Sequence, residues 1–458
     1  MAPGTTETAA SLRDYLQKQQ RPDIKLYTPS DDQYEAVREC FVIRPARPFA
    51  IARPQNAEDV QTLVKFCIEN DVDVTVRGGG HDPAGRTQVH GALVIDMRDI
   101  NYVRVDEDKT TARVGGGVLV GQVMKELAEY ELVTPCGMIS TVGYTGWATL
   151  GGYGPLSSLY GIGVDQIIHA KLVNAQGEIV DADGELLKGI RGAGGIFGPI
   201  VELTIKVYLL KEILLSTIVY EPGNIEAAWL AYIEGYERLL KEGMPRTFQL
   251  QPMVVELPSL GKVLIILATW ADPDHEEGRR LIDIVAGLNK CAVNLPEAVS
   301  LHKFTADNDK LSNYPSHGRV YTTSIKRWTP KTAQVLAKYG SQLPGGGTSL
   351  TVHGLRGPKP SEESVWGSRV DHHVIELISV TADPSYEKKA AAWALAFQKE
   401  LLETDPENIL ESSYISLLGD EDTNLKKIYG GHYDTLLDLK RKYDPQNVFK
   451  YAIPKLPV

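Results

Sequence analysis

The sequence lacks the features that would place it in two large classes of protein. No unbroken apolar run approaches the roughly 18 residues that a membrane-spanning helix needs. Basic residues are also too few, since 48 Lys and Arg stand against 59 Asp and Glu, for a formal net charge of −11. An acidic chain has a poor electrostatic footprint for nucleic acid or an anionic membrane surface. These absences argue against a membrane span and against a nucleic-acid partner.

Cysteine is scarce and scattered. The four cysteines, Cys40, Cys67, Cys136 and Cys291, form no C-x-x-C pair, which argues against a zinc site and against a dense disulfide framework. Residues 1–22 contain no apolar stretch of the kind found in secretory signals. We therefore expect no bound metal and a reducing, cytoplasmic location.

Two common nucleotide-binding signatures are also missing. The chain contains neither G-x-x-x-x-G-K-[ST] nor a strict G-x-G-x-x-G, so a Walker-type ATPase and a Rossmann-type NAD enzyme lack their fingerprints. What is present is an ordinary globular composition, with 43% hydrophobic and 23% charged residues in 458. That length is enough for more than one domain.

Glycine is the one residue type in clear excess. Of the 42 glycines, 24 fall between Gly78 and Gly198. They follow no fixed period and are interrupted by strand-like apolar runs, so this stretch is neither collagen-like nor a flexible linker. The pattern predicts many tight backbone turns within a folded domain.

The hydrophobic pattern predicts an α+β protein. In the first half it indicates helices over 56–69 and 119–131 and strands over 50–53, 73–76, 92–97, 111–114, 170–174, 178–182 and 200–209. Strand, helix and strand in residues 50–76 form a βαβ unit. Beyond residue 209 the pattern indicates a second domain of mixed α and β, with helices over 225–241, 275–290 and 385–402, strands over 248–255 and 262–270, and a helical tail over 424–444.

The strongest local motif is Arg77-Gly78-Gly79-Gly80-His81, directly after a predicted strand. Three consecutive glycines expose a row of backbone N–H groups with no side chains in the way, a geometry that cradles phosphates. Arg77 could add positive charge. A plain structural turn is the alternative interpretation, because two other glycine triplets, 115–117 and 345–347, have no Arg or His partners.

A second glycine cluster follows about 60 residues later. It contains Val142-Gly143, Gly146 and Gly151-Gly152, which would make further close backbone approaches. Two phosphate-cradling loops in one domain favour a long dinucleotide bound without a Rossmann turn.

Together with two further stretches, these motifs resemble a known family. The stretches are RGAGGIFG at 191–198 and KYDPQNVF at 442–449. In this order, the four motifs resemble those of the vanillyl-alcohol-oxidase superfamily of FAD enzymes, and within it the berberine-bridge-enzyme-like and 6-hydroxynicotine-oxidase-like oxidases. They span roughly residues 35 to 450, which is nearly the whole chain.

The resemblance implies an α+β architecture of four parts. An N-terminal segment covers 1–34, and a PCMH-type FAD-binding domain of two subdomains covers 35–209. A substrate domain with an antiparallel sheet flanked by helices covers 210–405, and a C-terminal segment that returns to the FAD domain covers 406–458.

The resemblance also implies bound FAD and identifies residues that would hold it. His81 is implied to be joined covalently to the 8α-methyl carbon of the flavin, as neutral imidazole is a nucleophile near pH 7. Some relatives attach the flavin a second time through a Cys, at the position that Ile139 occupies here. Cys136 lies three residues earlier, and it is either a buried thiol or a second site of flavin attachment. The implied cofactor-binding residues are Arg77, Gly78, Gly79, Gly80, His81, Val142, Gly143, Gly146, Gly151, Gly152, Gly198 and Val201.

Three residues are candidates for catalysis. Tyr414 stands where several relatives carry Tyr-x-Asn above the flavin, although a tyrosine with a pKa of about 10 needs a neighbouring cation to act as a base. Arg369 is the candidate for that cation, and Tyr144 is the third candidate. His372 and His373 would point to opposite faces of a strand, so at most one could face the flavin. Further candidates, each also open to a packing role, are Tyr153, Tyr321, His353, His372 and His373.

These residues favour an FAD-dependent oxidoreductase acting on a small molecule, with O2 as a candidate electron acceptor. Such an enzyme removes hydride from a C–H bond beside O or N to flavin N5. The tail lacks the Asn pair of the relatives, and the chain has 21 tyrosines, so we expect an apolar or aromatic secondary metabolite rather than a sugar. The alternatives are an FAD-containing cyclase whose flavin is structural, and an inactive FAD-binding protein.

Overall fold

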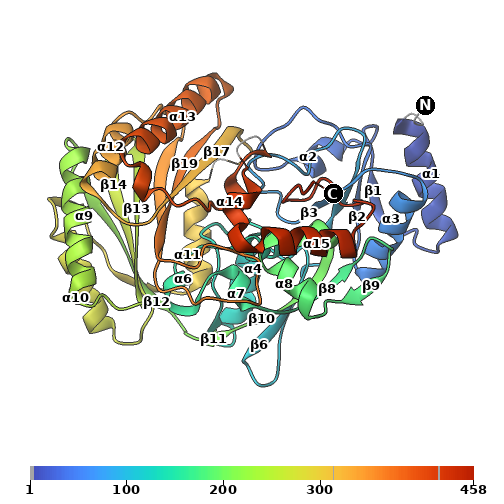
Figure 1. Cartoon of the computed structure of the whole chain (residues 1–458), viewed down its shortest axis with the longest axis horizontal. Helices are drawn as coiled ribbons and strands as arrows, with labels where there is room; N and C mark the ends of the chain where they lie inside the picture. Colours follow the sequence, from blue (N-terminus) through green and yellow to red (C-terminus); the bar gives the residue numbers. More distant parts are fainter. Residues whose placement is uncertain (1–4, 313, 421–422, 458) are drawn as a thin grey trace.

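Four β-sheets organise the chain in the computed structural model, which describes residues 5–312, 314–420 and 423–457. Three sheets lie within residues 25–209, and an eight-stranded sheet lies within residues 213–381. The two groups form two halves that lie side by side (Figure 1). Residues 1–4 and 458 of the predicted terminal segments lie outside the described residues, as do 421–422, and the domain boundaries at 34, 209 and 405 stay predictions.

The first sheet carries the glycine triplet. Strands β2 and β3 both pair in parallel with β4, and helix α3 connects β2 to β3, which confirms the predicted βαβ unit and places β4 between its strands. Asn56 caps helix α3, because its side-chain oxygen accepts a hydrogen bond from the Asp59 amide at 2.9 Å. The elements are α1 Thr5–Lys18, β1 Lys25–Tyr27, α2 Tyr34–Arg38, β2 Ala50–Arg53, α3 Ala57–Glu69, β3 Val74–Arg77, β4 Leu93–Asp96 and η1 Met97–Asp99.

The second sheet has five antiparallel strands in the order β5-β6-β10-β8-β9. The predicted strands over 170–174 and 178–182 correspond to β8 and β9, which pair antiparallel, and Gly177 between them lies in the left-handed region at φ +71°. The predicted strand over 200–209 divides into β10 and β11, and β11 pairs with β7 in a separate small sheet. The elements are β5 Val103–Val105, β6 Thr111–Gly115, α4 Val120–Ala128, β7 Leu132–Val133, α5 Tyr144–Thr149, α6 Ser157–Tyr160, α7 Gly163–Gln166, β8 Ile167–Val173, β9 Ile179–Asp181, α8 Gly184–Ala193, η2 Gly194–Phe197, β10 Ile200–Lys206 and β11 Tyr208–Leu209.

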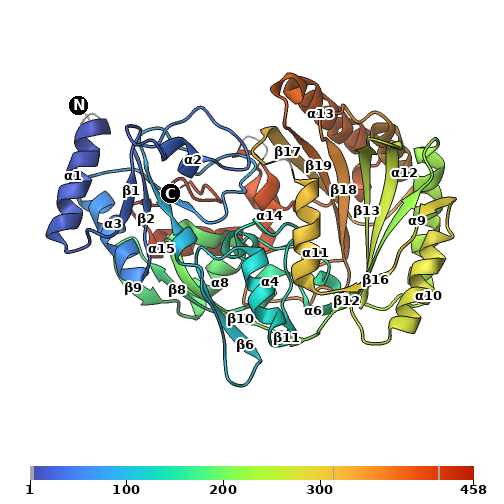
Figure 2. The same ribbon diagram turned by 180° about the vertical axis from the view of Figure 1, so that it is seen from behind.

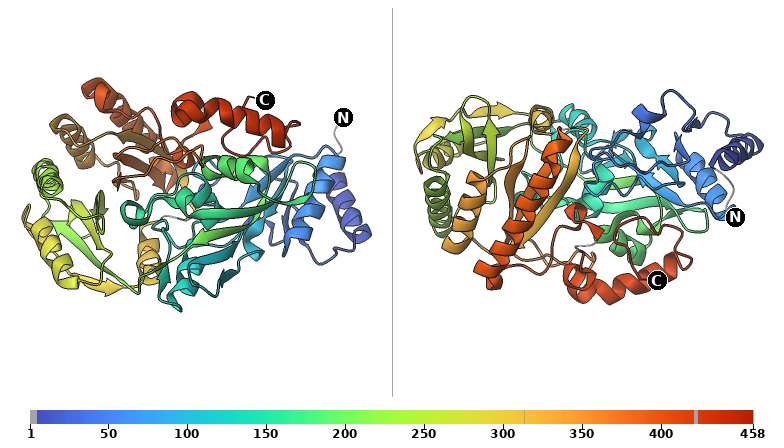
Figure 3. Two further views of the ribbon diagram at one scale, coloured as in Figure 1. Left: turned by 60° about the horizontal axis from the view of Figure 1, so that its bottom comes forward. Right: turned by 90° about the horizontal axis from the view of Figure 1, so that it is seen from above.

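The large sheet is antiparallel and is covered by helices on one face (Figures 1 and 3). Apolar residues at alternate strand positions, such as Val352, Ile375 and Leu377, pack with Trp229 and Phe397 of the covering helices. The other face is therefore left for the first half of the chain. The elements are β12 Ile213–Tyr220, α9 Ile225–Lys241, β13 Phe248–Leu257, β14 Gly261–Trp270, α10 His275–Ala286, β15 Cys291–Val293, β16 Glu297–Val299, α11 Leu301–Asn308, η3 Asp309–Leu311, β17 His317–Ile325, α12 Pro330–Ser341, β18 Ser349–Leu355, β19 His372–Thr381, η4 Pro384–Tyr386 and α13 Glu387–Thr404.

The contacts that join the halves include those of α11 and of the last helices. Helix α11 lies beside α4 (Figure 2), where Leu301 and Phe304 share a core with Val123 and Leu127. The last helices lie against the first half, next to α8 (Figures 1 and 3), and the Lys440 ammonium donates to the Ile196 carbonyl at 2.8 Å. The tail elements are η5 Pro406–Asn408, η6 Ile415–Leu417, α14 Leu425–Tyr429, η8 Gly430–His432 and α15 Tyr433–Tyr443.

None of the helices in the described ranges combines the length and the apolar character needed to cross a bilayer.

Candidate active site

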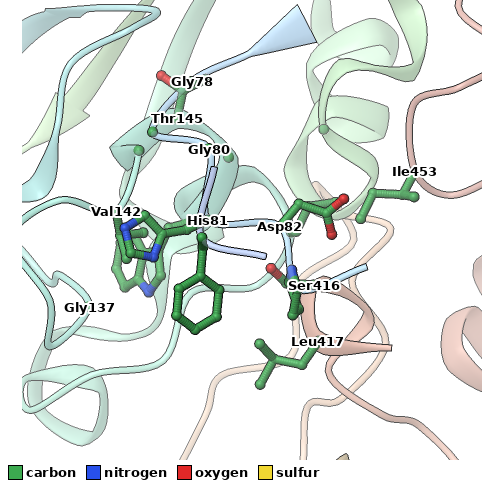
Figure 4. Close-up of a pocket in the computed structure, with 18 of the residues that line it drawn as sticks. Gly78, Gly80, His81, Asp82, Gly137, Val142, Thr145, Ser416, Leu417 and Ile453 are labelled. Carbon is green, nitrogen blue, oxygen red and sulfur yellow. The ribbon is translucent and has the colours of Figure 1, made fainter. Parts of the chain in front are cut away.

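A cavity of about 450 Å³ lies where the two halves meet. Its walls come from the loop after β3, from residues 137–150, from η2, from one face of the large sheet and from the tail. Figure 4 shows Gly80, His81 and Asp82 of the β3 loop between Val142 on one side and Ser416, Leu417 and Ile453 on the other. A cavity of this size suits a small molecule or part of a cofactor.

Two glycine loops touch at one end of this cavity. A Cβ atom at Gly79 would lie 2.3 Å from the Gly143 amide nitrogen and 2.6 Å from the Thr141 carbonyl oxygen, so the loops pack backbone to backbone. The amides of Gly78, Gly79, Gly80 and Gly143 donate to no acceptor within the described part of the protein. A row of unpaired N–H groups on a cavity wall fits the diphosphate of FAD.

His81 directly follows the glycine triplet and lines the same cavity. Its Nε2 atom shares a hydrogen bond of 2.8 Å with the Thr141 hydroxyl. Its ring clusters with those of Phe41 and Tyr314, at centroid distances of 5.2 and 5.3 Å. Burial lowers the pKa of His81 to about 4, against the opposing effect of the Asp309 carboxylate. The imidazole is therefore neutral at pH 7, which is the nucleophilic form.

The cavity brings together eight of the residues predicted to bind the cofactor, and four others lie elsewhere. Arg77, Gly151, Gly152 and Val201 are absent from its lining. The eight that line it are Gly78, Gly79, Gly80, His81, Val142, Gly143, Gly146 and Gly198.

The expected charge contribution of Arg77 needs correction. The guanidinium is almost fully buried and donates to the carbonyls of Val37 and Glu39. Backbone oxygens of the segment before β2 thus occupy the donors that we expected to meet phosphate. Arg77 anchors that segment beneath the glycine loop.

Three predicted residues lie behind the cavity wall and support it: Gly151, Gly152 and Val201. Gly151 and Gly152 have φ values of +122° and +83°, and a Cβ atom on Gly151 would lie 2.9 Å from the Trp366 indole nitrogen. These glycines let the chain turn closely under its neighbours. Val201 is a core residue whose carbonyl accepts from the Gly116 amide at 2.9 Å.

The opposite wall is one face of the large sheet. The Glu376 carboxylate lies 3.4 Å from Nε2 of His353, and both side chains are only 12% exposed. Gln251 donates to the Thr351 hydroxyl at 3.0 Å. The wall residues recur at every second position of their strands: Gln251 and Met253 on β13, Ser349, Thr351 and His353 on β18, and Glu376, Ile378 and Val380 on β19.

The sequence reasoning missed Glu376, although a signal for it was present. In residues 349–355 polar Ser349, Thr351 and His353 alternate with apolar Leu350 and Val352. That period of two is typical of a strand with one polar face, and it would have identified the wall.

Tyr414 lines the cavity, and its environment keeps it neutral. Burial and the nearby Glu376 carboxylate both raise its pKa. Its ring meets the Tyr153 ring edge to face at 4.9 Å. Tyr414 can therefore donate a hydrogen bond to a bound molecule, but it is a poor base.

The other two catalytic candidates lie outside the cavity lining. Arg369 pairs with Asp165 at 2.6 Å and stacks over Trp366 at 5.0 Å, so its charge is not available to Tyr414. Tyr144 is fully buried in the core of the first half, tilted against the Trp147 ring. An ion pair and core packing hold these two side chains outside the lining, so the cavity gives no support to a catalytic role for either residue.

Of the remaining candidates, Tyr153 and His353 line the cavity, whereas Tyr321, His372 and His373 do not. The Tyr153 hydroxyl lies 2.7 Å from Nε2 of His372, so His372 supports Tyr153 from behind. His373 packs against the Trp328 ring at 4.3 Å.

Cys136 does not line the cavity. Cys136 is fully buried, and burial raises the pKa of its thiol to about 12. Ile139, not Cys136, reaches the lining. Over the described residues, no three His, Cys, Asp or Glu side chains gather as a metal site.

Comparison with known proteins gives sequence matches of two kinds. The chain matches the family model for the FAD binding domain over residues 48–183 and the berberine and berberine like model over 418–453. The FAD-linked oxidoreductase aurO of Gibberella zeae is 31% identical over 95% of this chain and 86% of its own. (R)-6-hydroxynicotine oxidase of Paenarthrobacter nicotinovorans is 36% identical over 44% of this chain and 45% of its own.

Solved structures share the fold over the whole chain. 6-Hydroxy-D-nicotine oxidase of Arthrobacter nicotinovorans superposes with a TM-score of 0.84 at 23% identity, covering 95% of this chain and 98% of its own. Glucooligosaccharide oxidase of Acremonium strictum, described with a 6-S-cysteinyl, 8α-N1-histidyl FAD, superposes with a TM-score of 0.80 at 20% identity over 98% and 100%. These matches confirm the predicted α+β fold class.

Proposed function

This chain belongs to the FAD-linked oxidoreductases of the berberine-bridge-like family, and from that premise we propose that it oxidises a small apolar or aromatic metabolite at a C–H bond beside O or N. One observation carries the proposal. The lining of a single cavity contains unpaired glycine amides and His81 together with a carboxylate, Glu376, and a neutral phenol, Tyr414. A cofactor and a substrate can thus meet inside it.

Residues of the first half would hold the cofactor. The amides of Gly78, Gly79, Gly80 and Gly143 would bind the diphosphate, and the loop around Gly198 would complete the cradle. Bound FAD supplies the two-electron acceptor at its N5 atom.

Residues of the large sheet would handle the proton. Glu376 is the group placed to accept a proton from a substrate hydroxyl or amine, and His353 at 3.4 Å can share that proton. Tyr414 stays neutral and donates a hydrogen bond that orients the substrate. Glu376 is therefore the base in this proposal, and the phenol is not.

The lining supports an apolar or aromatic substrate. Met253, Ile378, Val380 and Leu417 add apolar surface to the cavity lining, which favours a flat hydrophobic molecule over a sugar. One relative is named for oxidation of 6-hydroxynicotine, a small aromatic molecule.

We also propose that His81 attaches the flavin covalently. A bond would form between an imidazole nitrogen and the 8α carbon, while one C–H bond of the methyl group and the imidazole N–H bond would break. The two protons and two electrons released would pass to dioxygen, which would leave as hydrogen peroxide. The neutral state of His81 supports this role.

Anaerobic mixing with a panel of aromatic alcohols and amines tests the oxidation. We expect at least one compound to bleach the oxidised flavin, and Glu376→Gln to slow that bleaching about a hundredfold with the flavin content unchanged. Admission of air should restore the colour and yield hydrogen peroxide. Product formation without bleaching would instead establish the non-redox cyclase and overturn the proposal.

A further inference from the structure

His81 is oriented by a hydrogen bond with Thr141, which belongs to another loop, rather than by residues of its own loop. Its only hydrogen bond in the described part of the chain is the one of 2.8 Å between Nε2 and the Thr141 hydroxyl. The Phe41 and Tyr314 rings both pack against the imidazole, at centroid distances of 5.2 and 5.3 Å, and their own centroids are 6.4 Å apart. Nδ1 is thus the nitrogen that remains free to react.

Thr141 in turn belongs to a segment that is fixed from the other half of the molecule. The Asp309 carboxylate accepts from the Ser140 amide at 2.8 Å and from the Ser140 hydroxyl. The Ser140 carbonyl accepts from the Gly121 amide at 2.8 Å. Ser140 is therefore bound on both sides, and the next residue, Thr141, has a defined position.

Asp309 owes its own position to the packing of α11 on α4. It directly follows α11, whose Leu301 and Phe304 are buried in the core of the first half. Figure 2 shows α11 beside α4. The contact therefore couples the segment between β16 and β17 to the loop that meets His81.

We propose that Thr141 and Asp309 are positioning residues for covalent flavin attachment. Asp309 fixes Ser140, and the Thr141 hydroxyl accepts from Nε2–H of His81, which leaves the lone pair on Nδ1 as the nucleophile. The bond forms between Nδ1 and the 8α carbon, the methyl proton and the Nε2 proton depart, and two electrons pass with them to dioxygen. This inference rests on the covalent attachment proposed above.

The rate of attachment tests the proposal. The full-length chain, produced under riboflavin limitation, is supplied with FAD in air, and the flavin retained after acid precipitation is followed alongside total bound flavin. We expect Thr141→Val to slow attachment about tenfold, the loss that one hydrogen bond implies, and Thr141→Ser to restore it. Total bound flavin should stay at the wild-type level in both variants.

Asp309→Ala should also slow attachment, and its matched control is Asp307→Ala. Asp307 lies on α11, is exposed and pairs with Lys303 at 2.7 Å, so its loss should leave the rate unchanged. Because Asp309 acts through Thr141, the double variant Thr141→Val with Asp309→Ala should be no slower than Thr141→Val.

Two outcomes would overturn the inference while leaving covalent attachment intact: wild-type kinetics for Thr141→Val, or multiplied rate losses in the double variant. Wild-type protein that retains no flavin after precipitation would overturn attachment itself, and the inference with it. If Asp309→Ala binds no flavin at all, the comparison of Thr141→Val with Thr141→Ser decides whether the inference holds.

Discussion

Burial sets the protonation state of single residues around the cavity. His81 and Tyr414 are both neutral at pH 7, because burial lowers the pKa of the imidazole to about 4 and raises that of the phenol. The neutral imidazole is suited to attack carbon, and the neutral phenol is suited to donate a hydrogen bond. The base must then be another group, and Glu376 is the carboxylate in the sheet wall.

Replacement of Tyr414 by Phe tests this division of roles. We expect kcat/KM to fall about tenfold, the value of one lost hydrogen bond, while the shape of the pH–rate profile stays the same. Tyr130→Phe, at an exposed site, serves as control. Disappearance of one limb of the profile in Tyr414→Phe would show that the phenol itself is the base.

His373 should make the stability of the protein depend on pH. Burial, with help from His372 and Arg356, lowers its pKa to about 3, whereas an unfolded histidine has a pKa of about 6.5. Below about pH 6.5 the unfolded state binds the proton and the folded state does not, so the unfolding free energy falls by about 1.4 kcal/mol per pH unit as acid is added.

In His373→Gln, the slope of the unfolding free energy against pH should correspond to one fewer proton bound on unfolding between pH 4 and pH 6. Denaturant unfolding at several pH values measures this slope. His90→Gln, at an exposed position, should leave the slope unchanged. An unaltered slope in His373→Gln would mean that His373 does not titrate between the two states.

At the scale of elements, bare backbone allows the loops to meet. The loop after β3 and the loop before α5 approach so closely that Gly79 and Gly143 have no room for side chains. The backbone at Gly79 is not in the left-handed region. The lack of room for a side chain, rather than the value of φ, therefore explains why position 79 is glycine.

Gly79→Ala should therefore prevent FAD binding. The added methyl group would lie 2.3 Å from a backbone nitrogen, and the two loops must separate, which breaks the row of amides. Gly184→Ala is the matched control, because a Cβ there has nothing within 4 Å and Gly184 does not line the cavity. Equilibrium dialysis with FAD should show wild-type affinity for Gly184→Ala and a loss of a hundredfold or more for Gly79→Ala; equal affinities would contradict the packing argument.

At the scale of the molecule, the tail closes the cavity. A buried ion pair of 2.6 Å between Lys440 and Asp444 fixes the end of α15 against η2. Asp444 also accepts from the amides of Val448 and Phe449, at 2.8 and 3.0 Å. The residues that follow, including Tyr451, form part of the cavity lining.

Lys440→Met should destabilise the protein by about 3 kcal/mol, because Asp444 would remain as an uncompensated buried charge. Thermal unfolding should show a lower Tm, partly restored by saturating FAD. The control is Arg441→Met, which breaks an exposed pair with Asp438 and should cost less than about 1 kcal/mol. Similar Tm values for the two variants would rule out a structural role for the buried pair.

The sequence by itself determined the features that depend on neighbouring residues. Glycine triplets, the Asn56 cap, and the helices and strands of the first half follow from backbone sterics and from periods of two and 3.6 residues. The Arg77–His81 motif predicted that the three glycines and His81 would act at one place, and these four residues do line one cavity because they are consecutive in the chain. The alternating pattern around His353 held similar information about the sheet wall.

Only the tertiary structure decided which side chains face the cavity. The sequence could not show that Arg77 would bind the carbonyls of Val37 and Glu39, or that Arg369 would pair with Asp165. It also could not bring Glu376 to His353, on a neighbouring strand. These contacts depend on strand register and on how the two halves pack, and both are set by the burial of the whole core rather than by any local stretch of residues.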